Sequence, residues 1–130
     1  MREKNSFLFL CDEGTESECL ARQLVGTTQA NALWALAVKQ GDDIYLFNYN
    51  TGVVRGPYSA RSGADCHQPE AWEGRYPVQV NISISSLTRE CHTRSQSSPS
   101  IVKRGRPTGE IGRAASELFA WLQREGIPIA

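Results

Sequence analysis

"GDDIYLFNYNTGVVRGPYSA", residues 41–60, has the pattern of a strand, a tight turn and a second strand. The side chains of the first strand alternate between two sets, and both sets are apolar: Ile44 and Leu46 on one face, Tyr45, Phe47 and Tyr49 on the other. A hairpin with one face in water would instead alternate apolar with polar residues. The first strand is therefore expected to have neighbours on both faces, as in a curled sheet or a barrel.

The second strand of this hairpin contains Gly56-Pro57. Proline has no backbone N–H to donate to a neighbouring strand, so this strand is expected either to lie at an edge or to contain a bulge. Two further strands are predicted. "SFLFLC" (6–11) is a short continuous apolar run, and "VQVNISI" (78–84) alternates apolar with polar residues.

Helices are predicted near both ends of the chain. Thr15 followed by Glu18 has the capping-box spacing, which predicts a helix over 16–25. Residues 110–125 repeat apolar side chains at helical spacing and precede Gly126, so they predict an amphipathic C-terminal helix.

Residues 30–40 fit either a helix or a strand at 34–38. With 130 residues and 40% hydrophobic content, the chain is expected to form one domain over 1–130. The mixture of elements predicts an α+β fold, in which a small sheet curls into a β-barrel with flanking helices.

The charges are unevenly distributed along the chain. Residues 1–88 contain 7 basic and 10 acidic side chains, whereas residues 89–130 contain 7 basic and 4 acidic ones. Residues 93–109 are rich in Ser, Pro and Arg and are predicted to form a flexible basic loop. Its Lys103, Arg104 and Arg106 are candidates for phosphate contacts, although a solvated loop explains them equally well.

The N-terminus has only a five-residue apolar run after its basic residues, too short for a signal peptide. No stretch approaches the length of a membrane span, so we expect a cytoplasmic protein with no membrane partner. In that compartment the four cysteines are expected to remain reduced thiols.

Sequence motifs for catalysis are missing: there is no G-x-S-x-G, H-E-x-x-H, Walker or G-x-G-x-x-G pattern. The Cys66-His67 and Cys91-His92 dipeptides leave a Cys–His enzyme or a zinc site as a weaker alternative. The spacing does not suit a metal, because structural zinc sites draw their ligands from close pairs. We therefore predict a protein that is not an enzyme, with no metal and no cofactor.

Two tryptophans are candidates for stacking on a nucleic-acid base. Trp34 and Trp72 have the ring surface that this contact needs. A tryptophan in a small domain more often belongs to the core, which is the favoured alternative for both.

Four segments resemble the development-and-cell-death (DCD) domain family: "TESECLARQLVG" (15–26), residues 41–60, "QPEAWEGRYPVQVNI" (68–82) and Cys91. The family's "EC…R.LFG" helix, "LFLFNY" strand, "G.F.A" return strand and "P.AW…FPAQV" segment all have counterparts within residues 7–91. A departure is Val25, where the family usually has Phe. The resemblance implies a PUA-like fold and a role in stress or cell-death responses.

The chain is more distantly similar to YTH domains, which bind N6-methyladenine in RNA within a cage of Trp rings. "DIYLFNYNTGVVRGPYS", "WEGRYPV" and "RPTGEI" (106–111) carry this similarity. It implies that Val25 and His67 occupy cage positions, so a cage specific for the methyl group lacks its stacking surface here. It also implies that Arg106 contacts the nucleic-acid backbone, while Pro107 replaces an acidic residue.

These expectations combine into a non-catalytic module that recognises RNA or single-stranded DNA, with an ordinary or a modified base held in the mouth of the barrel. The alternative is a protein-interaction or scaffold domain in stress or cell-death signalling, with a protein partner. The candidate nucleic-acid-binding residues are Asp12, Thr15, Thr27, Thr28, Trp34, His67, Trp72, Lys103, Arg104 and Arg106.

Overall fold

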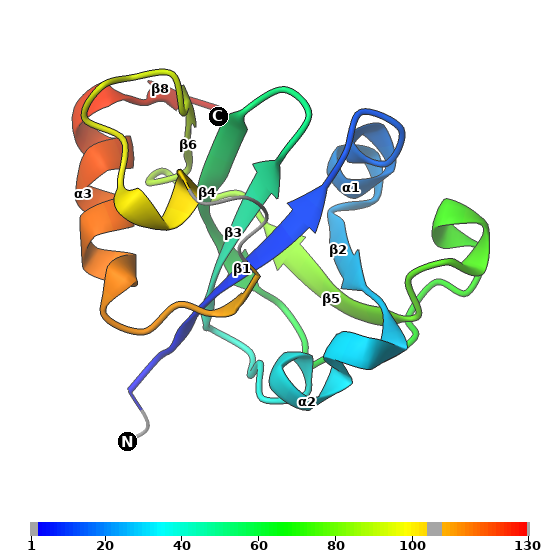
Figure 1. The fold of residues 1–130 in the computed structure, drawn as a ribbon. Helices are drawn as coiled ribbons and strands as arrows, with labels where there is room; N and C mark the ends of the chain where they lie inside the picture. Colours follow the sequence, from blue (N-terminus) through cyan, green and yellow to red (C-terminus); the bar gives the residue numbers. More distant parts are fainter. Residues whose placement is uncertain (1–2, 104–107, 130) are drawn as a thin grey trace.

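The computed structural model describes residues 3–103 and 108–129 (Figure 1). Its strands are β1 (Ser6–Cys11), β2 (Leu24–Thr27), β3 (Asp43–Asn48), β4 (Val53–Ala60), β5 (Val78–Ser83), β6 (Arg89–His92), β7 (Gly109–Glu110) and β8 (Ile127–Pro128). Its helices are α1 (Glu16–Arg22), α2 (Ala32–Ala35) and α3 (Ala114–Glu125), with short 3₁₀ turns η1 (Gln29–Asn31), η2 (Ala71–Gly74) and η3 (Ser100–Val102).

The strands form one mixed sheet in the order β2-β5-β4-β3-β1-β7, and β6 and β8 extend it beside β4. β2 and β5 curl away from the plane of β1 and β3, while α3 lies along the opposite side (Figure 1). The predicted α+β fold with a curled, barrel-like sheet and flanking helices is confirmed. None of the described helices is long and apolar enough to cross a membrane.

β3 lies inside this sheet, parallel to β1 and antiparallel to β4. Ile44 and Leu46 pack into the cluster enclosed by the curled sheet. Tyr45 and Phe47 point to the opposite face, where they pack into a second cluster that includes Leu118 and Leu122 of α3. Both faces of β3 are buried, which explains why neither of them is polar.

β4 changes its partner along its length, since its first half pairs with β6 and its last residues pair with β5. Tyr58 lies opposite Ile44 and Arg55 lies opposite Leu46, so β4 contains one residue more than β3 over this stretch. The extra residue falls at Gly56-Pro57, as the bulge alternative predicted. The alternative of an edge strand is wrong, because β4 has partners on both sides.

The helix predicted over 16–25 ends early. Gln23 adopts φ 51° and ψ 55°, a left-handed conformation that stops α1 at Arg22, and the chain then forms β2 antiparallel to β5. Leu24 and Val25 are buried in this strand. Two adjacent apolar residues fit equally well on the buried face of a helix and in a strand that is buried on both sides. Here the pairing with β5 selects the strand.

The capping box predicted at Thr15 and Glu18 is also absent, because Thr15 makes no side-chain hydrogen bond to α1. Its hydroxyl donates to the Asp12 Oδ1 instead. The Glu18 carboxylate is a partner of the Trp72 backbone.

The remaining helices follow the sequence pattern with shifted limits. Residues 29–35 form the consecutive turns η1 and α2, which selects the helical alternative for the ambiguous segment. α3 begins at Ala114 rather than at residue 110, since Gly109–Glu110 pairs with β1 as β7. Gly112, with φ 51°, cannot continue a right-handed helix and delays the start of α3.

Candidate nucleic-acid interface

A pocket of about 180 Å³ lies at the C-terminal end of β1. Its walls come from the loop after β1, the end of β2 with the turn that follows, the residue after β3, and the chain just before β5. The lining residues with polar side-chain N or O atoms or with rings are Asp12, Thr15, Thr27, Thr28, Asn31, Tyr49, Tyr76 and Thr108. We call this cavity the β1-end pocket. Four of the ten sequence-predicted site residues line it.

The loop between β1 and α1 holds the Asp12 carboxylate at the pocket. The Gly14 N–H donates to Asp12 Oδ1 at 2.9 Å, and the Thr15 hydroxyl donates to the same oxygen at 3.1 Å. The other oxygen, Oδ2, accepts a long hydrogen bond of 3.4 Å from the Tyr49 hydroxyl. This local turn is a common use of Asp, and it orients the carboxylate before any ligand arrives.

The opposite wall is formed by residues around the end of β2. Asn31 Nδ2 donates to Thr27 Oγ1 at 2.9 Å, which fixes the buried threonine, whereas Thr28 is exposed at the rim. Both threonines were predicted. Asn31 also lines the pocket and was not predicted, because only the fold of η1 brings it back toward β2.

Two half-buried tyrosine rings, Tyr49 and Tyr76, complete the lining. Tyr76 packs edge-on against Trp72, with ring centroids 5.6 Å apart at 74°. The Arg75 guanidinium lies 5.7 Å from the centroid of the Tyr76 ring. Neither tyrosine was predicted as a site residue. Their aromatic type was the only signal in the sequence, and Tyr49 was assigned to a strand face.

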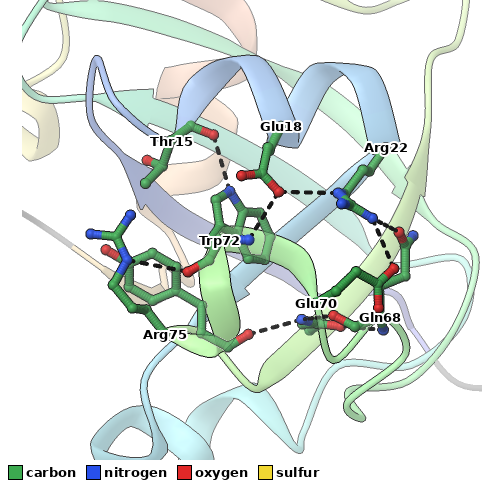
Figure 2. Close-up of polar contacts among 9 residues, drawn as sticks. Thr15, Glu18, Arg22, Gln68, Glu70, Trp72 and Arg75 are labelled. Atoms are coloured by element: carbon green, nitrogen blue, oxygen red, sulfur yellow. Dashed lines mark hydrogen bonds and ion pairs between the residues drawn. The ribbon is translucent and has the colours of Figure 1, made fainter.

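Trp72 is buried and is not among the residues that line the β1-end pocket; Figure 2 shows its contacts with Thr15 and Glu18. Its indole Nε1 donates to the carbonyl oxygen of Thr15 at 3.1 Å, and its backbone N–H donates to Glu18 Oε2 at 2.9 Å. Trp34 packs against Phe7 and Phe9 of the core. Trp72 thus belongs to the core and Trp34 is partly buried against it, close to the alternative favoured from sequence.

His67 and Val25 are not among the residues that line the β1-end pocket. Val25 is fully buried in the core. His67 is exposed, and its Nε2 lies 3.1 Å from Ser62 Oγ and 3.0 Å from the Gly63 carbonyl oxygen. The structure therefore does not bring His67 together with Asp12.

The predicted basic segment is only partly described. Lys103 is exposed, and its Nζ lies 3.4 Å from the Gln96 carbonyl oxygen. Arg104 and Arg106 fall outside the described residues. Thr108, the next described residue, lines the β1-end pocket and donates a hydrogen bond of 3.0 Å to the Leu8 carbonyl oxygen. The chain that follows the basic segment thus reaches the pocket.

Two of the four cysteines, Cys11 and Cys91, offer little nucleophilic chemistry. All four are free. The pKa of the Cys11 thiol is raised far above its usual range by a hydrogen bond with Cys19 and by burial. Burial and the Glu125 carboxylate also raise the pKa of Cys91. Thiols with raised pKa values stay protonated and are poor nucleophiles. Within residues 3–103 and 108–129, no three His, Cys, Asp or Glu side chains are grouped as a metal ion would require.

Solved structures of YTH domains share this fold. The YTH domain of Zygosaccharomyces rouxii MRB1, in complex with N6-methyladenosine RNA, aligns with a TM-score of 0.63 at 16% identity, covering 99% of this chain and 95% of that one. The Pho92 YTH domain, in complex with m6A, aligns with a TM-score of 0.67 at 14% identity, covering 95% and 86%.

The relatives found by sequence have a higher identity to this chain than these YTH domains do, but they are much longer proteins. The B2 protein of Daucus carota is 32% identical over 89 residues, which cover 62% of this chain and 43% of the carrot protein. The DCD domain-containing protein NRP-B of Glycine max is 32% identical over 84 residues, or 58% of this chain and 26% of that protein. The chain spans less than half the length of either relative. Residues 5–102 match the development and cell death domain, and the chain belongs to this family.

Proposed function

We propose that this domain binds single-stranded nucleic acid, preferably RNA, by holding one base in the β1-end pocket. The observation that carries the proposal is the convergence of a carboxylate, two threonines and two tyrosine rings on one small cavity: Asp12, Thr15, Thr27, Tyr49 and Tyr76. Unstacked bases are recognised by stacking on aromatic side chains and by hydrogen bonds to their polar edges. The shared fold of two domains solved with N6-methyladenosine RNA or m6A supports the same function.

The chemistry of the pocket favours a base with an exocyclic amino group. Among the hydrogen bonds of the described residues, Asp12 Oδ2 accepts one, a long one from Tyr49, so this oxygen remains the better acceptor for an incoming amine. Carboxylates accept hydrogen bonds from the amino groups of bases. A volume of about 180 Å³ is below the usual range of roughly 300–1,000 Å³ for drug-sized ligands, which suits a single base.

The decisive variant is Asp12→Asn, which keeps an oxygen for the local turn but offers an amide donor to the base. We expect affinity for oligo(A) and oligo(C) to fall by about 10- to 150-fold, since a hydrogen bond to a charged group contributes about 1.5–3 kcal/mol, with a smaller effect on oligo(U). Fluorescence anisotropy with labelled 12-mers measures this. Glu13→Gln is the matched control, because it removes the same charge from the next residue, which does not line the pocket. Equal effects of the two variants would contradict the proposal.

Lys103, Arg104 and Arg106 contact the phosphates of the bound strand in this proposal. Each phosphate neutralised on a single strand steepens the dependence of log affinity on log salt by about 0.7. The double variant Arg104→Ala/Arg106→Ala is therefore expected to weaken binding at low salt and to flatten this slope by about 1.4. An unchanged slope would remove these residues from the interface. Arg113→Ala/Arg124→Ala, with the same loss of charge on and beside α3, is the control.

A protein-interaction function, as a scaffold in stress or cell-death signalling, is the second candidate. Leu33 and Leu36 on and beside α2 are 93% and 58% exposed, an unusual position for two large apolar side chains. The double variant Leu33→Ser/Leu36→Ser is expected to abolish any self-association seen by light scattering without changing RNA affinity. A single-chain mass for the unaltered protein would argue against self-association as the function.

A further inference from the structure

The exposed side chain of Arg75 lies beside a wall of the β1-end pocket. Its guanidinium is 5.7 Å from the centroid of the Tyr76 ring, and Tyr76 lines the pocket. In Figure 2 the Arg75 side chain lies on the Thr15 side of Trp72, away from Arg22. Thr15 lines the same pocket. A positive charge is thus placed next to the cavity that would hold the base.

The backbone just before Arg75 holds this side chain in place. Trp72 and Glu73 both adopt a left-handed conformation, with φ of 51° and 55°. The Trp72 carbonyl oxygen accepts hydrogen bonds from the Arg75 backbone N–H and from Arg75 Nε, both at 3.2 Å. Strained backbone of this kind clusters at functional sites. The guanidinium is therefore oriented before any ligand arrives, which lowers the entropic cost of binding through it.

The outer edge of this guanidinium has no partner in the part of the chain that the structure describes. Within that part, Nε is the side-chain group of Arg75 that donates a hydrogen bond, and neither Nη1 nor Nη2 does so. No described carboxylate pairs with Arg75, whereas Arg22 is paired with Glu18 and Glu70. Paired N–H groups of Arg match two oxygens of a phosphate, and the planar guanidinium also stacks on aromatic rings.

We propose that Arg75 binds the phosphate of the nucleotide whose base occupies the β1-end pocket, with Nη1 and Nη2 donating to phosphate oxygens. This inference rests on the proposed function and adds a phosphate contact far in sequence from Lys103, Arg104 and Arg106. Asp12 lines the cavity itself and would repel a phosphate there, since like charges repel. The base therefore occupies the cavity and the phosphate lies at its edge, so the ligand is a nucleotide rather than a free base or a nucleoside.

Three matched probes separate phosphate binding from base binding: adenosine, its 5′-monophosphate and its 3′-monophosphate, titrated against the ¹⁵N-labelled protein. At least one monophosphate is expected to bind about tenfold more tightly than adenosine, the lower end of the effect of a hydrogen bond to a charged group. Equal affinities for all three probes would overturn this inference and leave base binding intact. If no probe gives saturable shifts, the inference also fails, and the 12-mer titrations decide the proposed function separately.

Arg75→Gln tests whether this side chain carries the effect. The ratio of monophosphate affinity to adenosine affinity is expected to fall about tenfold, and comparing two ligands on one protein cancels any change in the pocket itself. Arg75→Lys keeps the charge but not the paired donors, so its ratio should be intermediate. Arg61→Gln is the matched control, because Arg61 is also exposed and does not line the β1-end pocket. A ratio unchanged by Arg75→Gln, or lowered equally by Arg61→Gln, would overturn the assignment.

Discussion

Gly26 lies beneath the indole ring of Trp72. A methyl group added at position 26 would come within 2.6 Å of the ring carbon Cζ3, far closer than packed atoms approach. Trp72 and Glu73 both have left-handed backbones, with φ of 51° and 55°, a costly conformation for residues with side chains. The packing of the buried ring offsets this cost, and the ring holds the Thr15 backbone through its indole N–H.

Gly26→Ala should therefore destabilise the protein by overpacking, by about 1–3 kcal/mol. The backbone at Gly26 is not left-handed, so the effect comes from close contacts of the new methyl group with the Trp72 ring and with Tyr76 Cβ, 3.0 Å away. Gly63→Ala is the control, because its new methyl group would meet only Val38 oxygen at an ordinary 3.5 Å. Chemical denaturation measures both variants. Equal stability of the two would show that the ring shifts without cost.

The buried phenol of Tyr58 is expected to lower the free energy of unfolding as the pH becomes alkaline. Burial raises the pKa of its phenol from 10.0 to about 12. The unfolded chain loses this proton first, so the free energy of unfolding should fall as pH rises from about 10 to 12, by at most about 1.4 kcal/mol per pH unit. Tyr58→Phe should be as stable as the unaltered protein at pH 8 or slightly more so, and should lose less stability at pH 10.5. Parallel pH profiles in denaturant titrations would contradict this.

At the scale of elements, α1 anchors the long connection between β4 and β5. Glu18 Oε2 accepts hydrogen bonds from the Trp72 N–H and from Arg22 Nε, at 2.9 and 3.1 Å. Arg22 Nη1 in turn donates to Gln68 Oε1 and Glu70 Oε1, at 2.5 and 3.1 Å (Figure 2). One helix face thus holds a segment that has little regular structure of its own.

Glu18→Ala would leave the Trp72 N–H without its acceptor. We expect a loss of about 1–3 kcal/mol in the free energy of unfolding, the cost of an unsatisfied buried donor. Hydrogen exchange at the Trp72 amide should accelerate more than exchange in β3. Glu117→Ala, at an exposed glutamate of α3, is the control and should change neither quantity. Unchanged exchange at Trp72 would show that α1 does not anchor the segment.

At the scale of the whole molecule, two apolar clusters lie on opposite faces of β1 and β3. Phe7 and Phe9 of β1 point into the cluster enclosed by the sheet, while Leu8 points to the α3 side. β3 alternates in the same way. Each strand therefore contributes to both clusters, and neither cluster can open without disturbing the shared backbone.

Leu122→Ala tests this coupling from the α3 side, since Leu122 is fully buried there. Removing its side chain should cost about 2–5 kcal/mol. Thermal unfolding should nevertheless remain a single transition, with near-ultraviolet circular dichroism and the exchange of amides in β2 reporting the same midpoint. Two separate midpoints would show that the clusters unfold independently.

Much of the fold could be predicted from local pattern. The doubly apolar strand at 43–48 and the C-terminal helix follow from side-chain alternation and helical spacing. Proline chemistry predicted either an edge strand or a bulge at Gly56-Pro57, and the pairing of β3 with β4 selects the bulge. The predictions failed where one pattern fits two structures. Leu24 suits a helix face and a buried strand equally, and only pairing with β5 selects the strand.

The candidate site was predicted only in part. Asp12, Thr15 and Thr28 lie in short connections beside strand ends, where binding residues often occur, and Thr27 is the last residue of β2. All four line the β1-end pocket. Tyr49, Tyr76 and Thr108 were not predicted, because their positions depend on which strand ends meet.

The sequence by itself determined that the chain has a curled sheet with a strand buried on both faces, because alternation and turn chemistry depend on residues close together in the chain. Only the tertiary structure decided which residues share a cavity. Thr108 reaches the wall formed by Asp12 because β7 pairs with β1. Such contacts depend on strand pairings between distant segments, which no local pattern encodes.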